Sequence, residues 1–406
     1  MNRPKIVMLI TQLGYGGAET SFIRLANFLA QSMDVTVALF TPHYGAGAYA
    51  QGHAPLNVPV VLLDSPAVSG RIARWWRRIR TMQALKKKHD VCISFLSGPN
   101  MVNALSGAQH RTVISLRGSR FYDPVAPTWQ RLLFQYLLDP IAYHLAAQIV
   151  PVSAGLQNEM QHVAGKNIVS KVRVIPPFVE EDALQRRLAE APPERYAPLK
   201  GQKVIVAVGR LSIEKGFQHL IRVFHRVAAS HTGAKLLLVG DGPMLPELRA
   251  LCDTLGLPMD ELNPHVSSVL FALYQENALP LMALGRVYAM TSATEGFPST
   301  VLEAMAAGVP VVAADTPWGV RAILCANPTP THEPYPTATA TMVDYGMLMP
   351  RIDMAEHDGE WAHALGSYLE SPPVPDAGVA QRVQDYDIRR IGVQWQQLIR
   401  SMMECA

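Results

Sequence analysis

The sequence predicts an α/β protein with two parallel sheets in tandem, each of them Rossmann-like. The chain has 406 residues, more than the roughly 100–200 of one ordinary domain. Short apolar runs alternate with helical patterns, which is typical of a parallel sheet covered on both faces. This order restarts after a polar, Pro-containing stretch at 180–200. We therefore expect an N-terminal domain over residues 1–185, a C-terminal domain over 186–378 and a terminal helix over 379–406.

The expected strands are near-continuous apolar runs rich in Val, Ile and Leu. The first series is 6–10, 35–40, 91–95, 112–115 and 149–152, with helices at 20–31 and 71–88 among them. The second series is 204–208, 235–239, 269–271, 287–290 and 309–313. Apolar residues recur at helical spacing from Val379 to Met402, so the terminal helix has an apolar face that must dock on a flank of the protein.

Composition excludes several classes of protein. The net charge of +3 comes from 36 basic and 33 acidic residues, a balance that argues against a nucleic-acid binder. Four cysteines without a CxxC pair exclude a disulfide scaffold or zinc module and fit a reducing compartment. The apolar run 6–10 is shorter than the ~7–15 residues of a signal-peptide core, and no run approaches the ~20 of a membrane span. We expect a cytoplasmic protein.

A glycine pair follows the first expected strand. Adjacent glycines at 16 and 17 let the backbone approach a ligand, and the helix that follows presents N–H groups to an anion. The alternative is a plain strand-to-helix turn. A dinucleotide fingerprint is incomplete, because Glu19 stands where a third glycine is needed and no acid follows the second strand.

Two cations follow the first strand of the second half. Arg210 and Lys215 lie in the loop at the carboxyl edge of the expected sheet, where open α/β proteins bind ligands. A guanidinium and an ammonium there suit a diphosphate. The alternative is that both side chains are solvated.

Two carboxylates flank a turn in the stretch 294–312. Glu295 falls in the loop after a strand, and Glu303 falls about one turn into a helix. One could hold sugar hydroxyls and the other a ribose diol, while backbone N–H groups of 299–301 take phosphate. A Glu in the first turn of a helix can equally be a capping residue. The Asp385-Tyr-Asp387 sequence matches a DxD metal motif, but its place in the terminal helix argues against a metal site.

These motifs occur in a fixed order over nearly the whole chain. They are GGAE at 16–19, GRLSIEKG at 209–216, VGDGP at 239–243 and EGFPSTVLEAMAAGVPVV at 295–312. In this order they resemble the retaining GT-B glycosyltransferases called glycosyltransferase family 4, and most of all members that extend lipid-linked or exopolysaccharide glycans. The resemblance implies two Rossmann-like domains facing a central cleft, with the terminal helix crossing back to the first. It also implies a metal-independent hexosyltransferase with a nucleotide sugar as co-substrate and no further cofactor.

The resemblance implies roles for the matching residues. The catalytic group would comprise Glu295, Arg210, Lys215 and Arg117. The donor site would comprise Gly16, Gly17, Glu303, Gly296, Phe297, Pro298, Ser299, Thr300 and Leu273. In these roles the two glycines face the diphosphate, the 298–301 backbone completes the phosphate site, and Leu273 borders the base. Fixed cations would stabilise the departing diphosphate in place of a metal ion.

Two positions depart from the family pattern. Many members carry a histidine after the strand at 113–115, where this chain has Arg117. Arginine does not carry protons at neutral pH, so Arg117 is assigned to an acceptor or diphosphate contact. Ala322 stands where relatives often have glutamate.

The helix expected at 71–88 carries eight Lys or Arg residues and no acid, together with Trp75 and Trp76. A basic amphipathic helix with Trp is typical of an interfacial anchor. The expected membrane contacts are Trp75, Trp76, Arg77 and Arg78. The alternative is that the apolar stripe packs on the N-terminal sheet while the charges are solvated.

Together with the resemblance, these patterns predict a transferase that moves a sugar from a UDP- or GDP-sugar onto a lipid-linked saccharide in cell-surface polysaccharide or glycan assembly. The resemblance alone implies that the transferase is retaining. Its partners would be the nucleotide sugar, the lipid-linked glycan and the anionic inner face of the cell membrane, with no nucleic acid. Two alternatives stay open. One is a glycosyltransferase with a soluble small-molecule acceptor, and the other is a non-catalytic scaffold with a decayed donor site.

Overall fold

The computed structural model describes most of the chain. The described residues are 3–14, 16–42, 56–119, 127–259, 266–328, 337–374 and 376–404. They form two compact units: an N-terminal unit of residues up to 178 joined by residues from 386 onward, and a C-terminal unit of residues 179–385. The chain thus enters the C-terminal unit at Val179, ahead of the expected boundary after residue 185.

The N-terminal unit is built on a six-stranded parallel sheet with the order β3-β2-β1-β4-β5-β6. The strands are β1 (Lys5–Ile10), β2 (Asp34–Leu39), β3 (Val60–Leu62), β4 (Val91–Phe95), β5 (Thr112–Leu116) and β6 (Gln148–Pro151). The helices are α1 (Gly17–Ala30), α2 (Arg71–Lys86), α3 (Ser97–Leu105), α4 (Thr128–Leu133), α5 (Asp139–Leu145), α6 (Ala154–Ala164) and α15 (Ile388–Glu404). A π-helical turn, η2 (Phe134–Leu138), joins α4 to α5, and short 3-10 turns lie at Gln109–Arg111 and Lys166–Lys171. All five expected strands are present, and β3 adds a short edge strand that the sequence did not predict.

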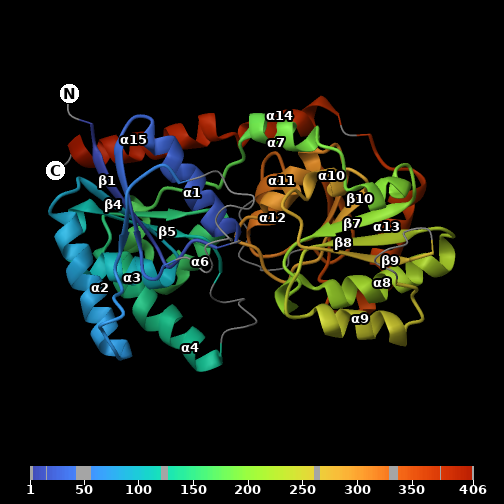
Figure 1. Cartoon of the computed structure of the whole chain (residues 1–406), viewed down its shortest axis with the longest axis horizontal. Helices are drawn as coiled ribbons and strands as arrows, with labels where there is room; N and C mark the ends of the chain where they lie inside the picture. The colour runs from blue at the N-terminus through green and yellow to red at the C-terminus, as the bar shows by residue number, and fades with distance from the viewer. Residues whose placement is uncertain are drawn as a thin grey trace. The chain divides into compact units, whose positions relative to one another are not determined.

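Alternate residues of β1 serve opposite faces of this sheet. Ile6, Met8 and Ile10 pack in the core shared with α1 and α15, whereas Val7 and Leu9 pack with α2 and α3. Figure 1 shows α15, in red, lying along α1 and the blue strands of this unit.

The C-terminal unit is built on a seven-stranded sheet with the order β12-β13-β11-β10-β7-β8-β9. It is parallel except for the antiparallel pair β12 and β13, which the sequence did not predict. The strands are β7 (Val204–Val208), β8 (Lys235–Val239), β9 (Val269–Leu273), β10 (Val287–Met290), β11 (Val311–Ala314), β12 (Thr341–Val343) and β13 (Gly346–Met349). The helices are α7 (Glu181–Leu188), α8 (Phe217–Ser230), α9 (Leu245–Thr254), α10 (Leu279–Met282), α11 (Ser299–Ala306), α12 (Gly319–Leu324), α13 (Asp358–Glu370) and α14 (Ala377–Asp385). Its 3-10 turns are Glu194–Leu199, Ile213–Lys215 (η5) and Ala355–His357.

The expected single terminal helix is two helices. The chain breaks at Asp387, whose carboxylate accepts the backbone N–H of Arg389 at 2.8 Å and so satisfies the start of α15. Before the break, α14 stays with the C-terminal unit, where Arg382 donates to the carbonyls of Ala322 and Ile323. After the break, α15 docks on α1, where a Cβ at Gly392 would lie 2.4 Å from the ring of Phe28. The Asp385-Tyr-Asp387 sequence therefore spans a helix boundary and does not lie within one helix.

Within the described residues, no helix combines the length and the apolar character needed to cross a membrane.

Candidate active site

The loop after β7 carries the first two predicted cations of the C-terminal unit. Its 3-10 turn, η5, ends at Gly216, which has a φ of 69°. A Cβ there would lie 2.3 Å from the carbonyl oxygen of Thr291, so this position requires glycine. Thr291 in turn donates its hydroxyl to the carbonyl of Lys215 at 2.8 Å. The loop after β10 thereby holds the end of the β7 loop in place.

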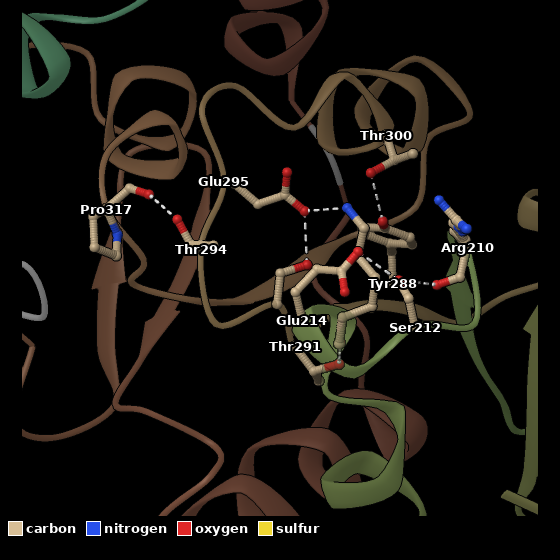
Figure 2. Close-up of polar contacts among 11 residues, drawn as sticks. Arg210, Ser212, Glu214, Tyr288, Thr291, Thr294, Glu295, Thr300 and Pro317 are labelled. Atoms are coloured by element: carbon tan, nitrogen blue, oxygen red, sulfur yellow. Dashed lines mark hydrogen bonds and ion pairs between the residues drawn. The ribbon is translucent and has the colours of Figure 1, made fainter. Parts of the chain in front are cut away.

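Lys215 and Glu295 form an ion pair at the carboxyl edge of the sheet. The Nζ of Lys215 lies 2.6 Å from Oε1 of Glu295, and the side chains are 27% and 14% exposed. Ser292 donates its hydroxyl to the same carboxylate oxygen at 2.7 Å. The two dashed lines that reach the Glu295 carboxylate in Figure 2 mark these contacts. The sequence assigned the ammonium to diphosphate and the carboxylate to sugar, and the structure brings the two groups together.

Arg210 stands apart from this pair. Its backbone carbonyl accepts the N–H of Ser212 at 2.8 Å, but its side chain is exposed. The guanidinium makes no hydrogen bond or ion pair with any residue that the structure describes, and Figure 2 shows no dashed line to it. A guanidinium in that state keeps all five N–H donors available for an anion.

The loop from Thr294 to α11 is fixed through its backbone. The N–H of Glu295 donates to the carbonyl of Pro317 at 3.0 Å, and the N–H of Trp318 returns a bond to the carbonyl of Glu295 at 2.8 Å. Gly319 allows this approach, because a Cβ there would lie 2.5 Å from both the carbonyl oxygen of Gly296 and the Cα of Phe297. Sequence reasoning missed Gly319, since it is a single glycine outside the motif that it supports.

Helix α11 begins at Ser299, after Pro298, without a side-chain cap on its first turn. The hydroxyl of Tyr288 donates to Oγ1 of Thr300 at 2.8 Å, and burial raises the pKa of that phenol well above its usual value. Glu303 lies one turn further along α11, near enough for its charge to add to the raised pKa of Tyr288. Thr300, in the first turn of α11, thus lies in the same cavity lining as the Lys215–Glu295 pair.

A small cavity of about 10 Å³ joins these groups. Its lining includes Lys215, Tyr288, Ser292, Glu295 and Thr300. Arg210 and Glu303 lie outside this lining. Leu273 lies at the end of β9 with a φ of 53°, a left-handed backbone that is rare for leucine and concentrates at functional sites.

The predicted residues of the N-terminal unit also converge. Helix α1 begins at Gly17, and Gly16 precedes it in an extended conformation. Arg117, just after β5, donates to Oγ of Ser21 at 2.7 Å and stacks over the ring of Phe95 at 4.6 Å. Burial lowers the pKa of Arg117 to about 10, against the opposing effect of the Glu19 charge. The pKa of Glu19 is raised by burial, with Arg117 acting in the other direction.

Arg117 lines a cavity of about 270 Å³ within the N-terminal unit. The polar residues around it come from six separate elements or loops. They are Ser97, Asn100, Ser115, Arg117, Ser119, Gln135, Asp139, Tyr143 and Glu159. Ser115 is fully buried, and its Oγ has no hydrogen-bond partner among the described residues. An unsatisfied buried hydroxyl beside an open cavity is typical of a polar binding site.

The four expected membrane contacts on α2 are mostly engaged inside the unit. Trp75 packs against the apolar core beneath the sheet, and Arg77 donates to the carbonyl of Leu63 at 2.9 Å. Arg78 makes a two-pronged contact with Asp64 at 2.7 and 2.6 Å. Only Trp76, 59% exposed, faces solvent without such a contact in the described structure. Much of the apolar stripe of α2 therefore packs on the sheet, whereas Ile72 and Trp76 are exposed at 76% and 59%.

The basic run of α2 also includes a cation with an internal role. Lys86 is 1% exposed and donates to the carbonyls of Asn103 and Gly107 and to Oγ1 of Thr112, all within 2.7 Å. Burial lowers its pKa to about 8. This lysine therefore stabilises the packing of α2 and is not available to a surface partner.

Both halves of the chain match known protein families. Residues 15–183 match the profile described as Glycosyltransferase Family 4, and residues 190–340 match the profile described as Glycosyl transferases group 1. Together the two profiles span most of the chain.

Individual relatives match at low sequence identity, and the curated ones match only part of the chain. The chain is 28% identical to the N-acetyl-alpha-D-glucosaminyl L-malate synthase of Bacillus anthracis over 40% of each chain. It is 33% identical to a lipopolysaccharide core biosynthesis glycosyltransferase of Rhizobium meliloti over 57% of this chain and 59% of the relative. With three curated relatives, the chain matches only 35 to 40% of the relative's length. Among solved structures, Anabaena HepE in complex with UDP and glucose superposes with a TM-score of 0.73 at 20% identity, covering 98% of this chain and all of the other.

Proposed function

The chain belongs to the GT-B glycosyltransferases of the family 4 type, and from that premise we propose that it transfers a sugar from a nucleoside diphosphate sugar to a lipid-linked saccharide. The observation that carries the proposal is the cluster at the sheet edge of the C-terminal unit. There an ammonium, a carboxylate and the start of α11 converge, with the unengaged guanidinium of Arg210 on the same β7 loop as the ammonium.

The cluster suits the charge changes of glycosyl transfer. As the bond between the sugar and the diphosphate breaks, negative charge grows on the departing phosphate and positive charge on the sugar. Arg210 and Lys215 would neutralise the phosphate charge, and the N–H groups at the start of α11 would add to that effect. Glu295 would accept hydrogen bonds from hydroxyls of the donor sugar once Lys215 leaves it to contact the diphosphate. Because fixed cations supply the charge, we propose catalysis without a metal ion, and retention of configuration as the family resemblance implies.

Two observations support the lipid-linked acceptor. The Rhizobium meliloti relative takes part in lipopolysaccharide core biosynthesis, as its name says, and exposed cations on α2 would suit an anionic surface. We accordingly propose a peripheral position on the inner face of the cell membrane.

A soluble acceptor is the second candidate. The Bacillus anthracis relative is named for the use of L-malate. A cavity of about 270 Å³ with Arg117 and several polar groups in its wall would also accommodate a small polar molecule. The third candidate, a scaffold with a decayed donor site, makes the opposite prediction for donor binding.

A donor screen tests the proposal. We expect one of the UDP-, GDP- or ADP-sugars, at 100 times its Kd, to stabilise the fold by about 2.7 kcal/mol in a thermal-shift assay. Radiolabelled sugar from that donor should then enter an organic-extractable lipid product. Label that enters only a water-soluble product would favour the soluble acceptor. Neither stabilisation nor hydrolysis with any donor would favour the scaffold and overturn the proposal.

A further inference from the structure

The helical segment 128–145 of the N-terminal unit has apolar side chains on its outer face and polar side chains on its inner face. This is the reverse of a helix on the surface of a soluble protein. The segment runs through α4, the π-helical turn η2 and α5 without interruption. We infer that its outer face rests in the surface of an anionic lipid leaflet, while its inner face holds the polar head of the acceptor. The inference rests on the proposed lipid-linked acceptor and names the surface and the cavity that would receive it.

The outer face gathers large apolar side chains. They recur at the i, i+3, i+4, i+7, i+8 spacing of one helix face, and their exposed fractions run from 39 to 69%. They are Trp129, Leu132, Leu133, Tyr136, Leu137 and Ile141. The other large apolar residues exposed in the described part of this unit number at most two in any one element. A contiguous apolar face with Trp and Tyr is typical of a surface that meets a lipid interface.

The inner face of the same segment is polar and buried. Gln135, Asp139 and Tyr143 follow one another at intervals of four residues, and each is at most 7% exposed. All three line the cavity of about 270 Å³ that also holds Arg117 and the unsatisfied hydroxyl of Ser115. The π-helical turn η2 includes Gln135 of the inner face, and π-helical turns are frequent at functional sites. One wall of the cavity thus has a polar side for a sugar or phosphate and an apolar side for its lipid.

Charge favours a lipid leaflet over a second copy of the chain. Residues 1–178 contain 18 Lys or Arg and 7 Asp or Glu, a net charge of +11, whereas residues 179–406 contain 18 and 26, a net charge of −8. Exposed cations of α2 include Arg71, Arg74 and Arg80. Helix α3 packs against α2, which carries these cations, and against α5, which continues from α4 and η2 and carries Ile141 of the apolar face. Two such basic units would repel each other face to face, whereas anionic headgroups would attract both.

The surface is tested by vesicle flotation of the full chain. We expect wild type to float with vesicles that contain 30% phosphatidylglycerol and to bind pure phosphatidylcholine vesicles weakly. The triple variant Trp129→Ser/Leu133→Ser/Leu137→Ser should lose at least tenfold in binding. The matched control Ile72→Ser/Trp76→Ser removes the two exposed apolar side chains of α2 and should keep most of the binding. A triple variant that binds like wild type overturns the inference, and so does loss of binding in the control alone.

Activity separates this inference from the proposed function. The triple variant should keep its thermal stabilisation by the donor and its transfer to a short-chain, water-soluble acceptor analogue, while transfer to acceptor in vesicles falls at least tenfold. Gln135→Leu on the inner face should keep vesicle binding and raise the KM for both acceptors. Undiminished transfer by the triple variant in vesicles would overturn the inference and leave the function intact. Failure of wild type to use any donor would overturn the function alone. A wild-type dimer in solution that the triple variant converts to a monomer, with no vesicle binding, would assign the face to a second copy and overturn the inference.

Discussion

The charged cluster of the C-terminal unit and the cavity of the N-terminal unit differ in whether their polar groups already have partners. In the cluster, Lys215 and Glu295 satisfy each other at 2.6 Å around a cavity of about 10 Å³. In the N-terminal unit, about 270 Å³ is open beside Ser115, whose buried hydroxyl has no partner among the described residues. The charged groups of the cluster therefore already pair with each other, whereas the cavity has open space and a hydroxyl that has no partner among the described residues.

The difference teaches which site has to rearrange. A diphosphate that recruits Lys215 must break its ion pair, so part of the binding free energy is spent on that exchange. The released carboxylate of Glu295 is then available to donor-sugar hydroxyls. The N-terminal cavity needs no such exchange, because Arg117 is already held by Ser21 and Phe95. We expect substitutions in the cluster to act on turnover and substitutions in the cavity to act on acceptor affinity.

Lys215→Ala should have the largest effect. It removes a phosphate ligand and leaves the partly buried carboxylate of Glu295 without its cation, so kcat/KM should fall by about 100-fold or more. Stopped or continuous assays of donor turnover would measure the loss.

Lys203→Ala is the matched control in the same unit. Lys203 pairs with Glu370 at the same 2.6 Å, but its side chain is 33% exposed and lies outside the cluster. It should leave kcat/KM within about twofold, because exposed ion pairs contribute little. Equal losses in the two variants would show that the cluster is only structural.

Arg210→Ala should have the second-largest effect, and it should lower activity without lowering stability. The guanidinium is exposed and makes no hydrogen bond or ion pair with a described residue, so its removal should not lower the melting temperature. A lost hydrogen bond to a charged group corresponds to about 1.5–3 kcal/mol, which predicts a fall in kcat/KM of roughly 10- to 150-fold. Wild-type turnover in a folded Arg210→Ala protein would remove Arg210 from the mechanism and leave Lys215 as the only phosphate ligand of the loop.

Most of the fold was predictable because each buried strand is a continuous apolar run. All ten expected strands occur, whereas β3, β12 and β13 have only three or four residues each, too few for a recognisable pattern. The terminal helix was predicted as one because its apolar spacing continues through the break. The break depends on the side chain of Asp387, which caps α15. The spacing of apolar residues carries no information about such a cap.

The two sites were not equally predictable. Lys215, Glu295 and Thr300 come from two contiguous motifs, 209–216 and 295–303, and were visible there, whereas Tyr288 and Ser292 lie outside both motifs and were missed. The cavity draws its polar wall from β5, α3, α6 and the 128–145 segment, none of which carries a motif. Arg117 was found only through the resemblance, and Gln135 and Asp139 were missed. Membrane contact was assigned to α2 on composition, which does not show that Trp75 packs on the sheet while Trp76 is exposed.

Arg117→Lys should affect the acceptor and not the donor. Lysine keeps the charge but loses the planar stack on Phe95, so the KM for acceptor should rise by about tenfold while the KM for donor stays constant. Steady-state kinetics with each substrate varied in turn would separate the two constants. Arg111→Lys is the control, since Arg111 donates to the carbonyls of Lys86 and His89 outside the cavity. A rise in the donor KM alone would move Arg117 to the diphosphate.

Ser115→Ala should have the smallest effect, and its sign separates a binding group from a packing group. Because Oγ has no partner among the described residues, its removal relieves a buried unsatisfied hydroxyl and should stabilise the unit by about 0.5–1 kcal/mol. That corresponds to a rise of roughly 1–4 °C in melting temperature for a unit of this size. The acceptor KM should rise about threefold or more at the same time, because the hydroxyl is then missing from the cavity wall. Calorimetry with and without acceptor would show both changes, and a lower melting temperature with unchanged KM would make Ser115 a core residue and remove the contrast between the two sites.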